Sequence, residues 1–397
     1  MTAGIAIAMP AALFRVASPG DNRGILAIEA GEWVIGIDAS RSEAARMTGT
    51  ERYSREVIAA MLRAGGHRFQ LYARAPIPDA GAAEMVVIPR ARLWTHLGLG
   101  PEVARRPPDA LFIPAHVLPI GVGLSRRPRA VVTVHDLGYR HFPSAHPLRQ
   151  RLYLDLSTWF SARHAAAIAA DSRDCAADLI RFYGVAPDKI TVAYPGPIPS
   201  VTLAPGRRGA ILAELGLAER AFVLFVGTLQ PRKNLRRLLL AMASPTLAGY
   251  DLVVAGGRGW GGEELETLAH GLGLGARAHF LGYVSDETKA ALLQGARALA
   301  MPSLHEGFGF PVLEAQMAGT PVVASNTSSL PEVAGDGAIL VDPLDPAAIA
   351  AGLAVAAGDD AVRADLIARG RVNVARFSWD TCARQILSLL VPVGGRR

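Results

Sequence analysis

The stretch Met301-Pro-Ser-Leu-His-Glu-Gly-Phe-Gly-Phe-Pro-Val-Leu-Glu314 decides the expected fold. The apolar residues 296–300 before it predict a buried parallel strand, and its two glycines predict a loop whose backbone can approach a ligand closely. Pro311 suits the first position of a helix, and Gly319 suits its C-terminal cap. The order strand, glycine loop, helix places a ligand site at a strand's carboxyl end, beside a helix N-terminus that favours anions.

Two carboxylates, Glu306 and Glu314, bracket this loop. Alone, Glu314 is also consistent with a first-turn glutamate placed for the helix dipole, an effect of ~0.3–1 kcal/mol. The longer string over residues 305–323, His-Glu-Gly-Phe-Gly-Phe-Pro-Val-Leu-Glu-Ala-Gln-Met-Ala-Gly-Thr-Pro-Val-Val, resembles the retaining glycosyltransferase family 4. The resemblance implies a GT-B fold, in which two doubly wound, Rossmann-like α/β domains face each other across a cleft.

The resemblance also implies roles for the residues of this stretch. Glu306 is expected to contact the hydroxyls of the donor sugar, and Glu314 the ribose hydroxyls of its nucleotide. The backbone amides of the glycine loop are expected to stabilise the leaving diphosphate, together with the helix dipole. The loop residues concerned are Gly307, Phe308, Gly309 and Phe310.

A second cationic loop follows the apolar strand predicted over residues 222–226. The loop reads Gly227-Thr-Leu-Gln-Pro-Arg-Lys-Asn234, and both Gly227 and Thr228 are donor-site candidates. Arg232 and Lys233 precede a helix N-terminus, where cations are unfavourable unless an anion binds there. We therefore expect a diphosphate site that needs no metal, and the resembling family uses this position in that way.

Two features of the first half point to the same kind of site. The apolar strand over residues 131–134 ends in His135-Asp136, and the resemblance places His135 beside the donor sugar; a structural histidine remains the alternative. Thr48-Gly49-Thr-Glu51 has the spacing of a capping box. It resembles the family's acceptor-side loop, which makes Gly49 a candidate, although a plain helix cap explains it equally well.

Composition bounds the remaining possibilities. The 397 residues suffice for two domains, and the net charge of +6 with pI 9.6 favours anionic partners. Only three lysines occur, at positions 189, 233 and 289, so each position is informative. The two cysteines, at 175 and 382, are expected to be buried thiols, which fits the cytoplasm.

The expected domains follow the alternation of strands and helices. Residues 1–32 are expected to be an extension outside the folded domains, since no basic segment precedes the apolar run at residues 5–16 as in a signal peptide. Residues 33–195 form the expected acceptor-side domain and residues 196–375 the nucleotide-sugar domain. The proline-rich residues 195–200 link them. Residues 376–397 are expected to form a helix that crosses back to the first domain, as the resemblance implies.

Basic stretches suggest a second surface. Arginines alternate with Leu93, Trp94, Leu97 and Leu99 over residues 90–106, and Arg126-Arg127-Pro-Arg129 follows. Such stretches can contact an anionic membrane, here the inner face of the plasma membrane, although a solvated face in an arginine-rich chain is the alternative.

The function that the resemblance implies is retaining transfer of a hexosyl group, mannose first, to a hydroxyl of a glycan or lipid-linked saccharide in surface-polysaccharide synthesis. The donor is expected to be a nucleoside diphosphate sugar, GDP-mannose first, with no other cofactor. No Asp-x-Asp pair or cluster with metal-ligand spacing appears, so we expect no metal. Arg232, Lys233, Glu306 and His135 are the expected catalytic residues.

Three alternatives stay open on sequence alone. One is a sugar-nucleotide epimerase on the same fold. Another is an NAD-dependent oxidoreductase, supported only by Gly257-x-Gly259-x-x-Gly262, a glycine pattern that follows the second strand of its half instead of the first. The third is a basic nucleic-acid-binding protein, which we do not expect because no nucleic-acid motif accompanies the charge.

Overall fold

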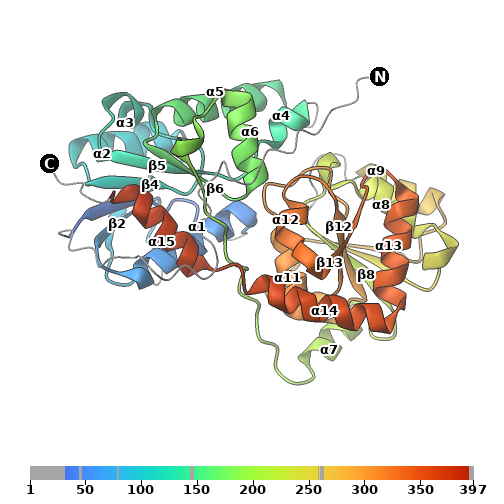
Figure 1. Ribbon diagram of the computed structural model, residues 1–397. Coiled ribbons are helices and arrows are strands. Elements are labelled where there is room, and N and C mark those ends of the chain that lie inside the picture. The colour runs from blue at the N-terminus through green and yellow to red at the C-terminus, as the bar shows by residue number, and fades with distance from the viewer. Residues whose placement is uncertain are drawn as a thin grey trace. The chain divides into compact units, whose positions relative to one another are not determined.

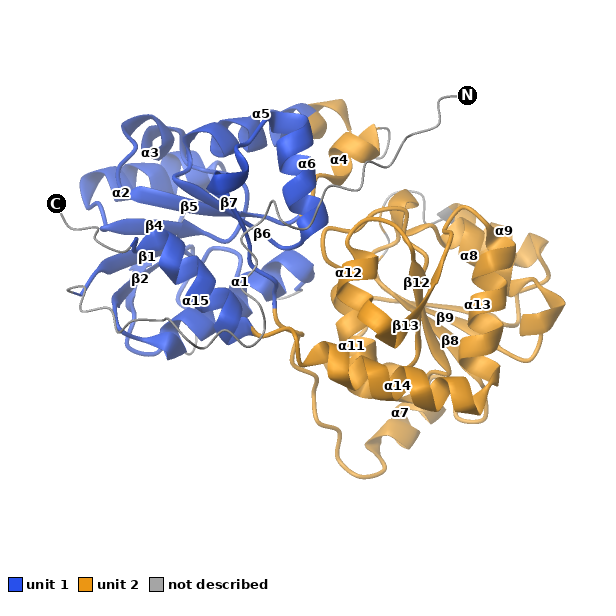
Figure 2. Ribbon diagram, in the orientation of Figure 1, with its two compact units in different colours: residues 1–135, 152–195, 379–397 blue, residues 136–151, 196–378 orange. Residues whose placement is uncertain are grey.

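The computed structural model of the chain describes residues 32–43, 47–77, 80–143, 147–257, 259 and 263–392. The extension expected at residues 1–32 therefore lies almost wholly outside the described residues. The chain forms two compact units, shown in blue and orange in Figure 2. Unit 1 comprises residues 1–135, 152–195 and 379–397, and unit 2 comprises residues 136–151 and 196–378.

Unit 1 is built on a seven-stranded sheet of order β3-β2-β1-β4-β5-β6-β7, in which every pair of neighbouring strands is parallel. Its central strands are apolar and buried on both faces, as a parallel sheet covered by helices requires. The strands are β1 (Val34–Asp38), β2 (Arg68–Ala73), β3 (Glu84–Val87), β4 (Ala110–Ile113), β5 (Arg129–Val134), β6 (Ala167–Ala170) and β7 (Ile190–Val192).

Helices cover both faces of this sheet. Figure 1 shows α15 on one side and α3 and α5 on the other. The helices of unit 1 are α1 (Gly49–Ala64), α2 (Gly100–Arg105), α3 (Ile120–Ser125), α5 (Leu148–His164), α6 (Arg173–Tyr183) and α15 (Trp379–Leu390), the first turn of α5 grouping with unit 2.

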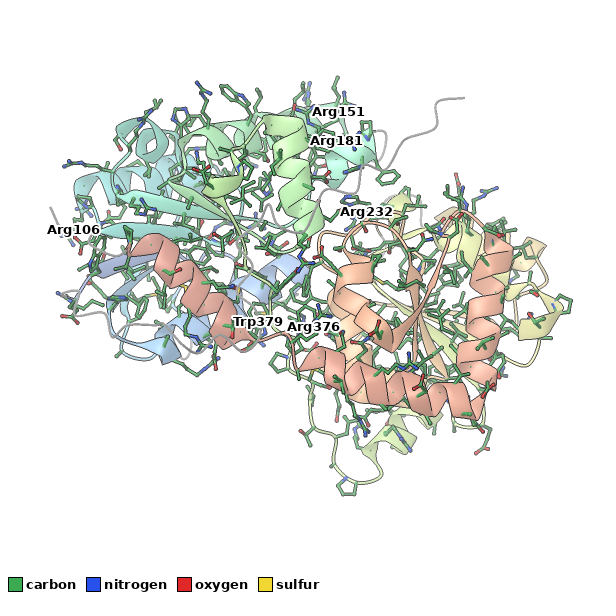
Figure 3. All side chains as sticks on the ribbon, viewed as in Figure 1. Arg106, Arg151, Arg181, Arg232, Arg376 and Trp379 are labelled. Atoms are coloured by element: carbon green, nitrogen blue, oxygen red, sulfur yellow. The ribbon has the colours of Figure 1, made fainter. Side chains whose placement is uncertain are left out.

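The C-terminal helix α15 belongs to the core of unit 1, although it follows unit 2 in the chain. It packs on α1, and Trp379 at its start is labelled in Figure 3. The Trp379 ring meets the Tyr53 ring edge-on, with 5.6 Å between the ring centroids. Ile386 and Leu390 are fully buried, and each such side chain contributes roughly 1.5–3 kcal/mol. Apolar burial therefore holds this last helix on unit 1.

Unit 2 repeats the same layout with a six-stranded parallel sheet of order β10-β9-β8-β11-β12-β13. Its core joins the buried faces of the central strands to α8 and α13. The strands are β8 (Phe222–Val226), β9 (Asp251–Ala255), β10 (Ala278–Gly282), β11 (Ala298–Met301), β12 (Val322–Ser325) and β13 (Ala338–Val341). The helices are α4 (Gly138–His141), α7 (Arg207–Glu214), α8 (Leu235–Met242), α9 (Glu263–Gly271), α10 (Asp286–Gly295), α11 (Phe310–Ala318), α12 (Leu330–Ala334), α13 (Pro346–Gly358) and α14 (Asp360–Val374).

The strand order of each sheet reverses at one place. In unit 1 the chain runs outward from β1 to β3 and then returns to β4 on the other side of β1. In unit 2 it runs outward from β8 to β10 and returns to β11 beside β8. Connections leave such a switch point in opposite directions and open a crevice at the strands' carboxyl ends. The β8–β11 switch point is thus the favoured ligand position in unit 2.

The units differ from the sequence-based division at residues 136–151 and 376–378. Residues 136–151 were expected in the first domain but belong to unit 2, because they pack with it although unit 1 flanks them in the chain. The boundary at residue 195 falls within the proline-rich stretch, and unit 2 extends to residue 378 before α15 begins. Among the described helices, none is both long and apolar enough to span a bilayer.

Candidate active site

The loop after β8 is fixed by one asparagine. Residues 231–233 form a single 3-10 turn that ends at Asn234, which has a left-handed backbone with φ of 62°. The Asn234 side-chain amide donates to the carbonyl oxygens of Pro302 at 2.9 Å and Pro343 at 2.7 Å. These bonds tie the loop after β8 to those after β11 and β13, and so position the two cations that precede Asn234.

Those cations meet the Glu306 carboxylate from the loop after β11. Arg232, labelled in Figure 3, donates from Nη1 to Glu306 Oε2 at 2.8 Å and to the His305 carbonyl at 2.9 Å. Lys233 donates from Nζ to Glu306 Oε1 at 2.6 Å. The Glu306 side chain is only 6% exposed. Three residues expected to act together are therefore in direct contact at the β8–β11 switch point.

The electrostatics of this cluster are coupled. Burial raises the pKa of Glu306, but Lys233 and Arg232 outweigh it and hold that pKa at about 2. Burial also opposes the charge of Arg232, yet Glu306 keeps its pKa raised. For Lys233 burial prevails and the pKa is lowered, only partly offset by Glu306. Two cations thus contact one carboxylate directly. Burial raises the pKa of Asp136, but the Arg232 charge and other contacts outweigh it, so Asp136 adds a second negative charge near Arg232.

Gly227 lies beside Lys233, and its backbone conformation favours glycine. Its φ of 150° is a backbone conformation that other residues rarely adopt, and a Cβ there would lie 3.6 Å from Cε and Nζ of Lys233. Thr228, which follows, is half-buried. Both expected residues thus lie in the cationic loop, beside the lysine stem.

Serine hydrogen bonds and aromatic contacts hold the glycine loop after β11 in place. Ser329 Oγ donates to the carbonyl oxygens of Glu306 and Phe308, both at 2.9 Å, and the amide of Glu306 donates to Ser328 Oγ at 3.0 Å. The Phe308 ring packs edge-on against those of Phe310 and Phe377. The loop is therefore fixed by contacts of both its backbone and its aromatic side chains.

Helix α11 starts immediately after this loop. Gly309 adopts a φ of 104° and precedes the first helical residue, Phe310, while Gly307 is buried in the loop. Gly319 caps the other end with φ of 75°. The backbone amides of residues 307–310 thus stand at the N-terminus of a nine-residue helix, which favours an anion.

Glu314 differs from its expected setting. Because α11 begins at Phe310, Glu314 lies in the second turn, so a first-turn dipole role is wrong. It is buried and forms an ion pair with Lys289 of α10. Both residues line a small pocket together with residues 199–201, at the end of the proline-rich linker. A ribose-binding role for Glu314 would use a carboxylate already held by this lysine.

In unit 1, His135 stands at the carboxyl end of β5. Its Nδ1 lies 2.7 Å from Asp171 Oδ2, at the end of β6, and its Nε2 lies 3.1 Å from the Pro114 carbonyl, after β4. Both partners accept hydrogen bonds, so the doubly protonated ring satisfies both. Burial lowers the pKa of His135, but the Asp171 charge outweighs it and the pKa is raised.

Gly49, the candidate on the acceptor side, is the first residue of α1 and is exposed. Thr48 and Glu51 form the expected capping box around it. Its neighbourhood thus has the local geometry of a plain helix cap. Gly49 and His135 belong to unit 1, and the cationic cluster and Glu314 belong to unit 2.

Of the dinucleotide-like glycines, Gly257 and Gly259 lie in the described part of the chain and Gly262 lies outside it. A Cβ on Gly259 would stand 2.3 Å from the Leu229 carbonyl oxygen, whereas one on Gly257 would meet nothing within 4 Å. On Gly256, which precedes the pattern, a Cβ would stand 1.9 Å from the Gly227 carbonyl oxygen. The loop after β9 therefore needs glycine to pack against the loop after β8. A nicotinamide cofactor is not required to explain it.

Several residues of the site escaped the sequence analysis. Ser328 and Ser329 carry no recognisable motif, and Asp171 is one acidic residue among many. Lys289 had one signal, the scarcity of lysine in this chain, which did not identify its partner.

The comparisons with known proteins agree with this geometry. The family described as "Glycosyltransferase Family 4" matches residues 47–197, and that described as "Glycosyl transferases group 1" matches residues 208–373. O-antigen chain mannosyltransferase B of Escherichia coli is 35% identical over 267 residues, which cover 66% of this chain and 70% of that protein. The chain belongs to glycosyltransferase family 4. This confirms the family resemblance, and the chain is a glycosyltransferase.

Other relatives match the chain over only part of their own length. The D-inositol 3-phosphate glycosyltransferase of Streptomyces scabiei is 37% identical over 238 residues, and the match covers 56% of this chain and 52% of that protein. This glycosyltransferase thus spans about half the length of such relatives.

Solved structures confirm the GT-B fold. Sucrose-phosphate synthase from Thermosynechococcus elongatus matches with a TM-score of 0.72 and 23% identity, covering 90% of this chain and 98% of that one. Anabaena HepE, solved in complex with UDP-glucose, matches with a TM-score of 0.71 and 21% identity at the same coverage.

Proposed function

We propose that this glycosyltransferase moves a mannosyl group from GDP-mannose to a hydroxyl of a glycan or lipid-linked saccharide, with retention of anomeric configuration. The observation that carries the proposal is the buried contact of Glu306 with Arg232 and Lys233 at the β8–β11 switch point. Mannose is chosen because the relative that this chain covers over 70% of its length is a mannosyltransferase.

Arg232 and Lys233 act on the leaving diphosphate in this proposal. The two cations attract the donor diphosphate, and both are already oriented by Glu306 and by the loop contacts of Asn234. Charge grows on the diphosphate as the glycosidic bond breaks, so fixed donors stabilise the transition state more than the ground state. The amides at the start of α11 add to this effect.

The remaining residues orient the donor. Glu306 contacts the sugar hydroxyls as well as the two cations, and Glu314 binds the ribose hydroxyls. His135 contacts the sugar, which requires its Nε2 to exchange the Pro114 carbonyl for a sugar hydroxyl. The donor phosphate takes the acceptor proton, and no metal is needed because the cationic cluster neutralises the diphosphate.

A donor screen tests the proposal. GDP-mannose is expected to raise the melting temperature more than UDP-glucose, the ligand of Anabaena HepE, since a ligand at 100 times its Kd adds ~2.7 kcal/mol. Product NMR with a lipid-linked saccharide acceptor then gives the linkage and anomeric configuration. A larger shift with UDP-glucose would overturn the choice of donor, and an inverted anomer would overturn retention.

A further inference from the structure

Helix α5 turns its large apolar side chains outward. Leu152, Leu156 and Trp159 follow a spacing of four and three residues, so they share one face, and they are 50%, 64% and 51% exposed. The residues that α5 buries are Thr158, Ser161 and Ala162. Helices that cover a sheet normally bury the apolar stripe. Packing of unit 1 therefore does not explain the outward stripe.

Helix α3 extends this surface. Its Gly123 lies against Phe160 of α5 so closely that a Cβ would stand 2.6 Å from the ring. Ile120 and Leu124, one turn apart on α3, are 51% and 65% exposed. Both helices lie on the same side of the sheet (Figure 1). We define the apolar face as Ile120, Leu124, Leu152, Leu156 and Trp159.

Cations gather beside the apolar face. Lys189 donates from Nζ to the carbonyl oxygens of Ala162, at 2.7 Å, and Arg163, at 3.0 Å, at the C-terminus of α5. Burial lowers the pKa of Lys189, and the charges of Arg126 and Arg163 lower it further. The lysine thus lies at the end of α5 that carries Arg163 and within the influence of Arg126.

The arginines of this group are exposed and unbalanced. We define the basic cluster as Arg126, Arg127, Arg163 and Lys189. Within the described part of the chain, none of its three arginines forms an ion pair. Repulsion within the cluster is relieved when an anionic surface approaches.

We propose that the apolar face and the basic cluster together dock the enzyme on an anionic lipid bilayer. Leucine, isoleucine and tryptophan side chains enter the boundary between headgroups and acyl chains, and the arginines bind lipid phosphates. A soluble polyanion would use the charges but not the outward apolar stripe, so the combination favours a membrane. This inference goes beyond the proposed function, because it concerns where unit 1 binds and not what is transferred.

The docking surface proposed from the structure does not include residues 90–106, the basic stretch that the sequence suggested for membrane contact. Trp94 and Leu99 of that stretch are buried in unit 1. Arg129 donates from Nε to the Leu389 carbonyl at 2.8 Å, so it supports α15. Of the second basic stretch, Arg126 and Arg127 remain in the docking surface.

Co-flotation with vesicles tests the proposal without donor or acceptor, so its outcome is independent of glycosyl transfer. The wild-type chain is expected to bind phosphatidylcholine vesicles that contain about one third phosphatidylglycerol, and to bind pure phosphatidylcholine weakly. The double variant Arg126→Glu/Arg163→Glu is expected to lose at least about 30-fold in partitioning, since each arginine contributes about 1 kcal/mol near such a surface. The matched control is Arg208→Glu/Arg236→Glu, which changes two exposed arginines of unit 2 by the same charge.

A second pair tests the apolar face. Leu156→Ser/Trp159→Ser is expected to weaken binding about tenfold or more through lost apolar burial. Its control, Leu344→Ser/Val372→Ser, alters residues of unit 2 that are 60% and 74% exposed and is expected to bind normally. Circular dichroism and melting temperature confirm folding of every variant.

Four outcomes would overturn the proposal: no vesicle binding by the wild type, equal losses in both charge variants, full binding by the Leu156/Trp159 variant, or a dimer that only this variant dissociates.

Discussion

Two polar strand ends, one in each unit, differ in how their charges meet. At the end of β5 in unit 1, one carboxylate faces one histidine, and both ring nitrogens of His135 have protein acceptors. At the β8–β11 switch point of unit 2, Glu306 contacts two cations directly, and Asp136 adds a further negative charge near Arg232. Two cations held side by side by one carboxylate make unit 2 the better candidate for the proposed anion site, while the histidine of unit 1 is oriented by its own unit.

Removing the carboxylate of unit 2 is expected to have the largest effect on stability. Glu306→Gln leaves two buried cations without the carboxylate that contacts both, which costs about 3–5 kcal/mol. Urea unfolding at neutral pH measures this loss, with Glu264→Gln on exposed α9 surface as the control. Equal stability of the two variants would show that the cations are not held by Glu306.

The loss of stability of the wild type at low pH tests the same carboxylate. A pKa of about 2 is below the ordinary value of 4.5, so the stabilisation is fully present above pH 4.5 and lost as pH falls towards 2. The loss is on the order of 3 kcal/mol. Glu306→Gln is expected to lack this component, and an identical acid dependence in both proteins would contradict the ion-pair account.

Lys233→Ala tests the role of the two cations during catalysis. It is expected to lower kcat by ~10²–10³ and to raise KM less, because charge on the leaving group grows in the transition state. Lys189→Ala, which removes a lysine from unit 1, is the control in assays with a soluble acceptor. Unchanged kcat in a folded Lys233→Ala enzyme would refute the phosphate role.

Glu314→Gln separates ribose binding from the cationic cluster. Donor affinity is expected to fall by roughly 1–3 kcal/mol, because the ribose hydroxyls lose a charged acceptor. Calorimetric titration of wild type and variant with the nucleoside diphosphate sugar gives the comparison. A donor Kd equal to that of the wild type would leave Glu314 as a structural partner of Lys289 only.

The pair of His135 with Asp171 in unit 1 is expected to respond to pH in the opposite direction. A raised pKa of His135 means that its stabilisation is present below about 6.5 and is lost as pH rises through the folded pKa. Nitrogen NMR of labelled histidine is expected to show that His135 titrates above pH 6.5. The Asp171→Asn variant is expected to lower this pKa. A His135 that titrates below 6.5 in the wild type would contradict the ion pair.

Much of this arrangement is readable from the sequence. The apolar strands, the glycine loop and Gly319 predict the elements around Glu306, and Arg232 and Lys233 stand out because cations are unfavourable at a helix start. Both loops follow strands, so the doubly wound fold brings them together. The sequence could not give the ion pair of Glu314 with Lys289, because packing of α10 against α11 decides it.

Helix α5 shows the opposite case. It was not predicted, because its buried face carries threonine, serine and alanine while its leucines and tryptophan face outward. An apolar stripe on a helix normally marks the face that packs in the core, but on α5 it marks an exposed surface. The grouping of residues 136–151 with unit 2 likewise depends on packing and has no local signal.

The central claim is that the two cations of unit 2 bind the donor diphosphate without a metal. The most direct measurement is calorimetric titration of GDP, UDP and their nucleosides into wild type and Lys233→Met, in excess EDTA. We predict that the preferred diphosphate binds the wild type in EDTA more tightly than its nucleoside does. In Lys233→Met this advantage is expected to shrink about tenfold or more, because one charge-assisted hydrogen bond is lost. Diphosphate binding that disappears in EDTA and returns with Mn²⁺, or that is equal in the two proteins, would contradict the account.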